Sequence, residues 1–249
     1  MIMESQKLLS LTRKCIDLYR LIDDGDHVAV GVSAGKDSLS LLVTLSRLQK
    51  FYPHPFKLSA ITVDLGIGNM DLEPVKELCA KLEVPYYIVK TDIAEVLFNI
   101  REESNPCALC AKLRKGALND KAKEIGANKI AYAHHKDDLI ETSIMALIYE
   151  GRYYTFSPKT YLDRTGLTVI RPFILVDEAD IIGYARTQGL PVCKNPCPMD
   201  GVTKREYVKN LLKQIYRENP GAEKRLFRAV VDGNLPGWPE RQEDERHKL

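Results

Sequence analysis

The hydrophobic positions of this chain follow two patterns that take turns along it. Over residues 4–22, apolar side chains recur every three to four positions, which predicts an amphipathic helix. Residues 27–33 (HVAVGVS) form instead a short valine-rich run, which is typical of a strand buried in a parallel sheet. The same two patterns continue downstream. Strands are predicted at 27–33, 56–64, 85–90, 129–135 and 168–173, and helices at 4–22, 37–50, 73–83, 112–126 and 137–150.

The alternation of strands and helices predicts an α/β fold, namely an open parallel sheet with helices on both faces. Residues 1–190 are expected to form this domain, and residues 191–249 a helical C-terminal extension packed on it. Ligands of such sheets bind at the carboxyl ends of the strands, near the point where the strand order reverses. Three polar segments follow predicted strands, at 32–38, 64–68 and 134–138, so we expect them to meet at one edge.

The loop VSAGKDS, after the first predicted strand, has the composition of an anion-binding loop. It does not match the Walker A pattern, because only one residue separates Ser33 from Gly35 and an Asp follows the lysine. The hydroxyl groups of Ser33 and Ser38, the backbone at Gly35 and the charge of Lys36 would meet the N-terminus of the next helix, where anions bind. Asp37, in the first helical turn, suits the helix dipole or a magnesium ion. The alternative is an ordinary strand–turn–helix connection with a capping serine.

The six cysteines are interpreted according to the compartment that the sequence predicts. The N-terminal segment lacks the pattern of a signal peptide and no apolar run is long enough to span a membrane, so we expect a cytoplasmic, reducing environment. There, the Cys107–Cys110 pair and the later Cys193 and Cys197 are more typical of metal or redox groups than of disulfides. A redox pair, a zinc site using all four, and an iron–sulfur cluster using three with one iron open are the three options. The other two cysteines fall on amphipathic helices and are expected in the core.

Several motifs together resemble one family. The SAGKDS loop is similar to the PP-loop of the ATP pyrophosphatases, which cleave ATP between the α and β phosphates. With CALCAKLRKGAL, AYAHHKDDLIET, VIRPF and CPMDGVTKREYVKNLL, residues 5–237 resemble the tRNA 2-thiocytidine synthetase family of PP-loop enzymes. The resemblance implies the adenine nucleotide alpha hydrolase-like fold and ATP-dependent tRNA thiolation, through an adenylated intermediate and a 4Fe-4S cluster. The implied cofactors are that cluster, ATP and Mg²⁺.

The resemblance also implies roles for individual positions. Catalytic roles fall on Lys36 and Asp137, and cluster ligation falls on Cys107, Cys110 and Cys197. Arg114 is also a catalytic candidate, because it lies one turn beyond Cys110, where it could steady phosphates or an oxyanion; a solvent-facing charge is the alternative. Nucleotide binding falls on Ser33, Ala34, Gly35, Lys36, Asp37, Ser38, Asp64 and His134. The chain departs from the family pattern at Ala34, where the family's loop has glycine, and at Cys193, where the spacing differs by one residue. A plain capping role for Asp137 stays open, as do the roles of spare thiol, persulfide carrier or ligand for Cys193.

The charge of the chain neither requires nor excludes RNA. Lys and Arg number 36 against 34 Asp and Glu, so the net charge is only +2. Residues 204–228 are locally basic, with eight Lys or Arg, three Glu and two Tyr, which suits RNA contact or an ordinary solvated helix. As partners we expect tRNA and a sulfur donor (a cysteine desulfurase persulfide, sulfide or a sulfur carrier) and no membrane, with a homodimer as one option.

Three rival functions remain open at this point. They are a PP-loop amide ligase with a structural zinc, the same thiolation chemistry on a small molecule, and a non-catalytic nucleotide-binding protein that senses iron or oxygen. Metal content distinguishes the first, tRNA binding the second, and ATP turnover to AMP and pyrophosphate the third. The sequence does not specify whether a cytidine or a uridine is modified.

Overall fold

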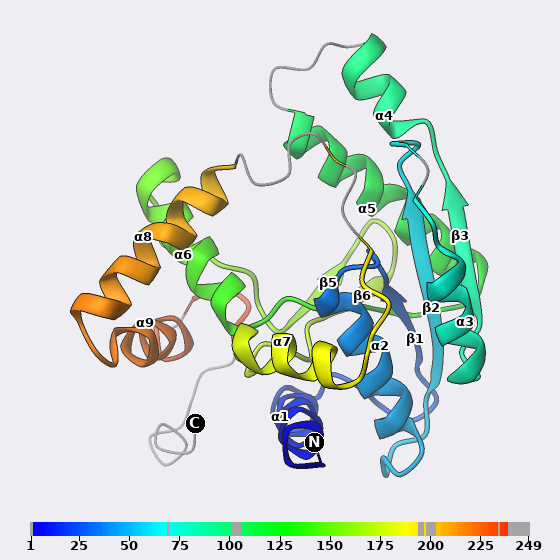
Figure 1. The fold of residues 1–249 in the computed structure, drawn as a ribbon, viewed down its shortest axis with the longest axis horizontal. Coiled ribbons are helices and arrows are strands. Elements are labelled where there is room, and N and C mark those ends of the chain that lie inside the picture. Colours follow the sequence, from blue (N-terminus) through cyan, green and yellow to red (C-terminus); the bar gives the residue numbers. More distant parts are fainter. Residues whose placement is uncertain are drawn as a thin grey trace.

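The computed structural model describes residues 2–68, 70–100, 106–193, 197, 203–233 and 235–238 (Figure 1). A six-stranded sheet forms the centre of this part of the chain, in the order β3-β2-β1-β4-β6-β5. Its strands are β1 (His27–Gly31), β2 (Lys57–Asp64), β3 (Tyr86–Lys90), β4 (Lys129–Ala131), β5 (Lys159–Leu162) and β6 (Leu167–Ile170).

All pairings in the sheet are parallel except that of β5 with β6. From β1 the chain builds β2 and β3 on one side and then returns to build β4 on the other, so the strand order reverses between β1 and β4. The predicted α/β fold is therefore confirmed. The antiparallel edge strand β5 was not predicted, because its four residues are only half-buried and carry no continuous apolar run.

Helices cover both faces of the sheet, as expected from strands buried on both sides. One face packs against α1 (Ile2–Tyr19), α2 (Lys36–Gln49) and α7 (Glu178–Thr187). The opposite face packs against α5 (Pro106–Glu124). Alternation within β1 shows the two faces directly, because Val28 and Val30 belong to the first core cluster and Ala29 to the second.

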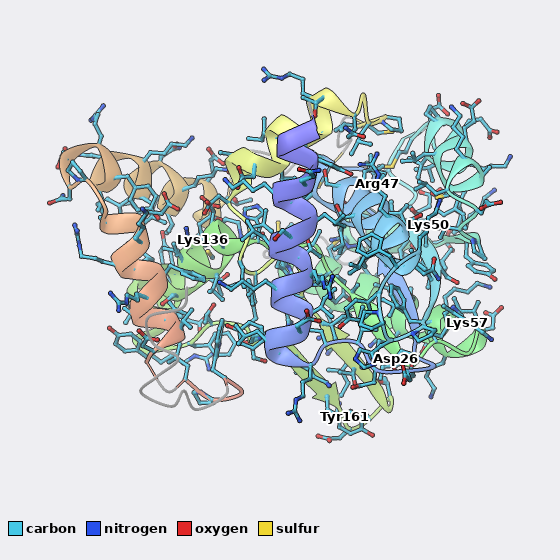
Figure 2. All side chains as sticks on the ribbon, turned by 90° about the horizontal axis from the view of Figure 1, so that it is seen from below. Asp26, Arg47, Lys50, Lys57, Lys136 and Tyr161 are labelled. Atoms are coloured by element: carbon cyan, nitrogen blue, oxygen red, sulfur yellow. The ribbon has the colours of Figure 1, made fainter. Side chains whose placement is uncertain are left out.

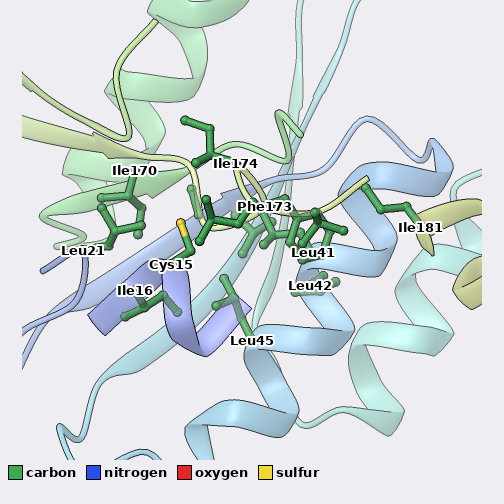
Figure 3. Packing of buried hydrophobic residues seen from close by; sticks show 14 of the residues in the cluster. Cys15, Ile16, Leu21, Leu41, Leu42, Leu45, Ile170, Phe173, Ile174 and Ile181 are labelled. Atoms are coloured by element: carbon green, nitrogen blue, oxygen red, sulfur yellow. The ribbon is translucent and has the colours of Figure 1, made fainter. Parts of the chain in front are cut away.

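The larger core cluster lies between the sheet and the helices α1, α2 and α7 (Figure 3). Leu41, Leu42 and Leu45 of α2 contribute to it, together with Phe173 from the segment that follows β6. Cys15 of α1 is fully buried in this cluster, and Cys79 of α3 (Glu73–Lys81) is also buried. The expectation that these two cysteines are core residues is confirmed.

The C-terminal helices α8 (Lys204–Glu218) and α9 (Ala222–Val231) pack beside α6 (Lys136–Glu150), at one side of the sheet (Figure 1). Their apolar side chains, such as Val208 and Phe227, join the same core cluster as α2 and α7 rather than a separate core. A short helix α4 (Ile93–Glu95) and a π-helical stretch at Val96–Ile100 follow β3. Within the described residues, no helix is long and apolar enough to cross a membrane.

Candidate active site

The carboxyl ends of β1, β2 and β4 surround a cavity of about 640 Å³. Each of the three polar segments predicted to meet contributes to its walls, which confirms that expectation. From the loop after β1 come Ser33, Gly35, Lys36, Asp37 and Ser38; from β2 and beyond come Asp64, Leu65 and Ile67; from the β4 end come His134 and Asp138. The cavity lies where the strand order reverses, which is the usual ligand site of an open α/β sheet.

The loop between β1 and α2 is stabilised by hydrogen bonds between its own residues. The Ser33 N–H donates to Ser38 Oγ at 3.1 Å, and Ser38 Oγ donates to Gly35 O at 3.1 Å. Ala34 has a φ of +59°, in the left-handed region that favours glycine, although its methyl group is fully buried. Gly35 is the N-cap of α2 and has no side chain to cap the first turn, so the N–H groups there are available to an anion that enters the cavity.

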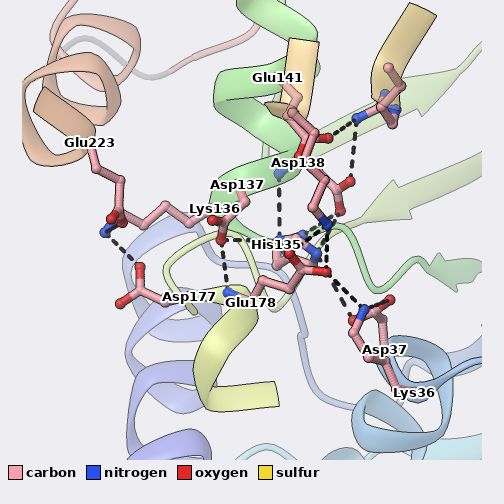
Figure 4. A network of polar contacts seen from close by, with 12 residues as sticks. Lys36, Asp37, His135, Lys136, Asp137, Asp138, Glu141, Asp177, Glu178 and Glu223 are labelled. Carbon is pink, nitrogen blue, oxygen red and sulfur yellow. Dashed lines mark hydrogen bonds and ion pairs between the residues drawn. The ribbon is translucent and has the colours of Figure 1, made fainter. Parts of the chain in front are cut away.

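Lys36 is held at the cavity wall by two carboxylates (Figure 4). Its Nζ lies 3.0 Å from Asp37 Oδ2 and 3.0 Å from Glu178 Oε1, at the start of α7. Glu178 is shared, since its Oε2 also lies 2.7 Å from Lys209 Nζ of α8. Burial would lower the pKa of Lys36, but Asp37 and Glu178 outweigh it and hold the pKa above its usual value. Lys36 therefore stays protonated. Its ammonium group can move from these two carboxylates to a phosphate that binds in the cavity.

The two aspartates at the start of α6 point in different directions (Figure 4). Asp138 lines the cavity, accepts from the His135 N–H at 3.1 Å and contacts Arg205 Nη1 of α8 at 3.3 Å. Asp137 does not line the cavity as the described residues form it. Its Oδ2 accepts a hydrogen bond from the Glu178 N–H at 2.8 Å and lies 3.4 Å from His135 Nδ1. Burial would lower the pKa of His135, but Asp137, Asp138 and Asp37 around it hold that pKa above its usual value. Asp137 thus reaches the site through the start of α7 and through His135.

His134 is a buried imidazole on the cavity wall. Its ring packs 4.7 Å from that of Phe156, and burial lowers the pKa of His134 to about 4, so the ring is neutral near pH 7. Its Nδ1 is buried without a hydrogen-bond partner among the described residues. A neutral ring on the cavity wall fits a nucleotide base, which offers a flat face.

A second, smaller pocket of about 150 Å³ adjoins the first. Its walls contain Cys107 and Cys110 of α5 together with Cys197, and the rest of its lining is mostly apolar. Ile67 and Arg114 line both pockets, so the two are neighbours. The three cysteines that the resemblance singled out are thus brought together beside the main cavity.

Cys193 is separated from this group. It lines the main cavity instead, where its Sγ contacts Asp71 O at 3.3 Å and its N–H donates to Ala34 O at 3.0 Å. No three His, Cys, Asp or Glu side chains in the described ranges are arranged to share a single metal ion. Three thiols around an apolar pocket fit a cluster, whose several irons spread the ligands apart, better than a zinc site that uses all four cysteines. Burial raises the pKa of the Cys110 thiol above its usual value, and the nearby Arg114 offsets part of this rise.

Comparison with known proteins assigns the chain to a family. Residues 5–215 match the model of the PP-loop domain. The tRNA-cytidine(32) 2-sulfurtransferase of Geobacter sulfurreducens is 33% identical over 236 residues, covering 92% of this chain and 90% of the relative. That of Syntrophotalea carbinolica is 35% identical over 233 residues, covering 92% and 89%. The chain belongs to the tRNA-cytidine(32) 2-sulfurtransferase family of PP-loop proteins.

A solved structure supports the fold of this family member. The U34-tRNA thiolase NcsA from Methanococcus maripaludis, solved with its 4Fe-4S cluster, has a TM-score of 0.75 and 23% sequence identity. The match covers 92% of this chain and 79% of that one. An NH3-dependent NAD synthetase from Campylobacter jejuni shares the fold more distantly, with a TM-score of 0.51 and 18% identity.

Two site residues of this 2-sulfurtransferase family member were missed by sequence reasoning. Glu178 binds Lys36, and Arg205 binds Asp138 and Glu141, yet both come from helices outside the strand–loop segments that the sequence marked. Glu178 lies five residues after the VIRPF motif, in a stretch that carries no motif of its own. Arg205 stands in the basic helix, where sequence alone does not separate a residue facing the site from one facing solvent.

Proposed function

We propose that this protein is an ATP-dependent tRNA thiolase that replaces the C2 oxygen of a tRNA cytidine with sulfur. The observation that carries the proposal is the adjacency of the two pockets, which share Ile67 and Arg114. One has an anion-binding loop and a neutral imidazole, and the other has three cysteines. An ATP site beside a thiol-lined pocket has the parts that activation of an oxygen and its replacement by sulfur require.

ATP occupies the larger cavity in this proposal. Lys36 and the first-turn N–H groups of α2 hold its phosphates, and Ser33 and Ser38 add hydroxyl groups. Asp37 and Asp64 line the same cavity and supply the carboxylate oxygens that Mg²⁺ prefers. His134 contacts the base through its ring on the cavity wall. These groups hold the α phosphate where a pyrimidine oxygen can reach it.

The reaction then consists of two substitutions. The C2 oxygen of the cytidine attacks the α phosphorus of ATP, and pyrophosphate leaves. Sulfur bonds to C2, and AMP leaves with that oxygen. Arg114 lies between the two pockets and is placed to stabilise negative charge on the departing phosphate. Asp137 positions His135 and the start of α7, which carries the Lys36 partner Glu178.

Cys107, Cys110 and Cys197 are the residues that would hold a 4Fe-4S cluster. Such a cluster, bound by three thiolates, supplies one iron without a protein ligand at which sulfur can be held near the nucleotide. The sulfur itself comes from a donor. Sulfide, or a carrier that delivers sulfur as sulfide, supplies it at the oxidation level of the product, whereas the persulfide of a cysteine desulfurase also requires a thiol reductant that provides two electrons and releases the sulfur from the S–S bond.

The test is the complete reaction with anaerobically purified protein. Unmodified tRNA, ATP, Mg²⁺ and sulfide should yield AMP, pyrophosphate and 2-thiocytidine, identified by mass spectrometry of the digested tRNA. Lys36→Ala removes a charge-assisted phosphate contact, so turnover should fall by about 100-fold or more while the melting temperature holds. ATP cleavage that is independent of tRNA and yields no thionucleoside would contradict the proposal, as would normal turnover by Lys36→Ala.

A further inference from the structure

A group of exposed tyrosines lies on the surface where α6 ends and α8 begins. Tyr149, Tyr153 and Tyr154 are 42%, 68% and 43% exposed, and Tyr207 of α8 is 60% exposed. Neither pocket includes them. Large exposed aromatic side chains that gather on one surface commonly mark an interaction site. We call this group, together with Arg152 and Lys204, the tyrosine patch.

Two cations of the tyrosine patch lie directly over its rings. Lys204 Nζ is 4.7 Å from the centroid of the Tyr149 ring, and the Arg152 guanidinium carbon is 4.5 Å from that of Tyr154. One carboxylate, Glu150, lies 2.6 Å from Arg152 Nε and offsets part of the charge. Flat rings beside Lys and Arg suit the two parts of a single-stranded nucleic acid, since bases stack on the rings and phosphates pair with the cations.

The backbone at the end of α6 builds this surface. Gly151 ends the helix with a φ of +62°, in the left-handed conformation that glycine adopts easily. The turn leaves Arg152, Tyr153 and Tyr154 exposed next to the last turn of the helix. The Lys204–Tyr149 contact then joins the start of α8 to the same surface.

The position of the patch relative to the active site fits a bound RNA strand. α6 begins at the cavity, where Asp138 lies, and ends at Tyr149 and Glu150. Its 15 residues span about 22 Å at 1.5 Å per residue. That length equals about six stacked nucleotides at roughly 3.4 Å each. A base in the active site and its neighbours on the patch can therefore belong to one stretch of unpaired RNA.

We propose that the tyrosine patch binds unpaired nucleotides of the tRNA substrate, outside the active site, by stacking on Tyr153 and Tyr154 and by pairing phosphates with Arg152 and Lys204. The inference rests on the proposed function and adds to it the surface that holds the RNA. RNA rather than a protein is the occupant, because cations over exposed rings match a chain that has a base and a phosphate at every unit.

The experiment measures tRNA affinity by fluorescence anisotropy over a range of salt concentrations, with the full-length protein. In Tyr153→Ala/Tyr154→Ala, the Kd for tRNA should rise by about tenfold or more for each lost stacking contact. In Arg152→Gln/Lys204→Gln, the Kd should rise and the dependence on salt should weaken, because fewer counterions are released. ATP affinity should not change in either variant, since the patch is separate from the cavity.

Two matched controls test whether position matters rather than residue type. Tyr161→Ala removes a tyrosine that is 61% exposed on β5, beside Thr168 near the amino end of β6 (Figure 2). Lys57→Gln removes an exposed lysine at the amino end of β2. Both residues lie at the end of the sheet opposite the cavity. Both control variants should therefore bind and thiolate tRNA as the wild type does.

Each other outcome has a separate meaning. If the wild type thiolates tRNA but the patch variants bind it with unchanged affinity, the patch inference fails and the proposed function stands. If the wild type neither binds nor thiolates tRNA, both fail. If size-exclusion chromatography with light scattering shows a wild-type dimer that the tyrosine variants lose, at unchanged tRNA affinity, the patch is a self-interface and the inference is wrong.

Discussion

At the scale of single residues, the two adjacent aspartates of α6 separate chemistry from positioning. Asp138 faces the cavity, whereas Asp137 accepts a hydrogen bond from the Glu178 N–H and lies beside His135. A carboxylate that lines a ligand cavity can act on the ligand directly. A carboxylate that contacts a neighbouring helix and an imidazole acts through those groups. Its removal changes the position of the helix end and the pKa of the imidazole.

Substitution of each aspartate by asparagine distinguishes these roles. Asp137→Asn keeps an oxygen that accepts the Glu178 N–H, so the melting temperature should hold while turnover falls and the pKa of His135 decreases. Asp138→Asn should also lower the pKa of His135, because Asp138 Oδ2 lies 3.4 Å from His135 Nε2, and it should lower turnover further than Asp137→Asn, because Asp138 lines the cavity. Turnover and the His135 titration, followed by NMR, measure both. A loss of melting temperature in parallel with activity for Asp137→Asn would leave only a capping role.

His134 gives the stability of the protein a pH dependence of known sign. Burial lowers its folded pKa to about 4, whereas an unfolded histidine titrates near 6.5. Between these values the unfolded chain binds a proton that the folded chain does not, so stability decreases as the pH falls, by at most about 1.4 kcal/mol per pH unit. His135, whose pKa is raised, loses its stabilising contribution only above pH 6.5 and so acts outside this window.

Urea unfolding between pH 7 and pH 4 checks this dependence. The difference in unfolding free energy between the wild type and His134→Gln should shrink steadily as the pH falls, because the variant lacks the titrating group. A constant difference across the range would show that His134 is not buried in its neutral form.

At the scale of elements, α5 brings cysteine and arginine side chains to two pockets at once. Cys107 and Cys110 are three positions apart and Arg114 follows one turn later, so all three share one side of the helix. The third cysteine, Cys197, comes from a segment far along the chain. Helical spacing therefore accounts for two ligands, and only the tertiary fold accounts for the third.

Replacement of each cysteine by alanine tests the ligand set. Cys107→Ala, Cys110→Ala and Cys197→Ala should each lose most of the iron and sulfide counted per chain after anaerobic purification. Cys193→Ala is the internal control and should retain the iron, because that thiol lies in the main cavity. Retention of iron by Cys197→Ala with loss in Cys193→Ala would move the third ligand, and zinc in place of iron would sink the sulfur-transfer mechanism.

The elements differ in how far the sequence predicts them. The valine-rich run of β1 and the leucine spacing of α2 are strong local patterns, so the sheet and the loop between them were predicted correctly. The edge strand β5 and helix α7 were not predicted. Each has few apolar residues, and their packing depends on residues that are distant in sequence. The same limit applies at the site. Local motifs marked Lys36 and Asp137, of which only Lys36 lines the cavity, and nothing local to Glu178 shows that it contacts Lys36.

At the scale of the whole molecule, the two ends of the sheet have different tasks. The carboxyl end of the sheet carries the cavity and the charged side chains that line it. The amino end carries a buried ion pair, in which Lys129 Nζ of β4 contacts Asp26, Asp23 Oδ2 at 2.8 Å and Leu21 O at 2.9 Å. Figure 2 shows Asp26 on this underside, between α1 and the strands. Lys129 thereby joins β4 to the chain before β1.

This division predicts that loss of Lys129 affects stability and not catalysis. Lys129→Ala leaves the buried Asp26 carboxylate without its partner, which should cost about 3–5 kcal/mol of unfolding free energy. The double variant Lys129→Met/Asp26→Leu removes both charges and should recover part of that loss, because an apolar pair needs no countercharge, while the Asp23 N–H and the Asn128 amide lose the oxygens to which they donate. Thiolation per folded molecule, measured well below the melting temperature, should match the wild type in both variants. A loss of turnover in the stable double variant would show that the amino end of the sheet also shapes the active site.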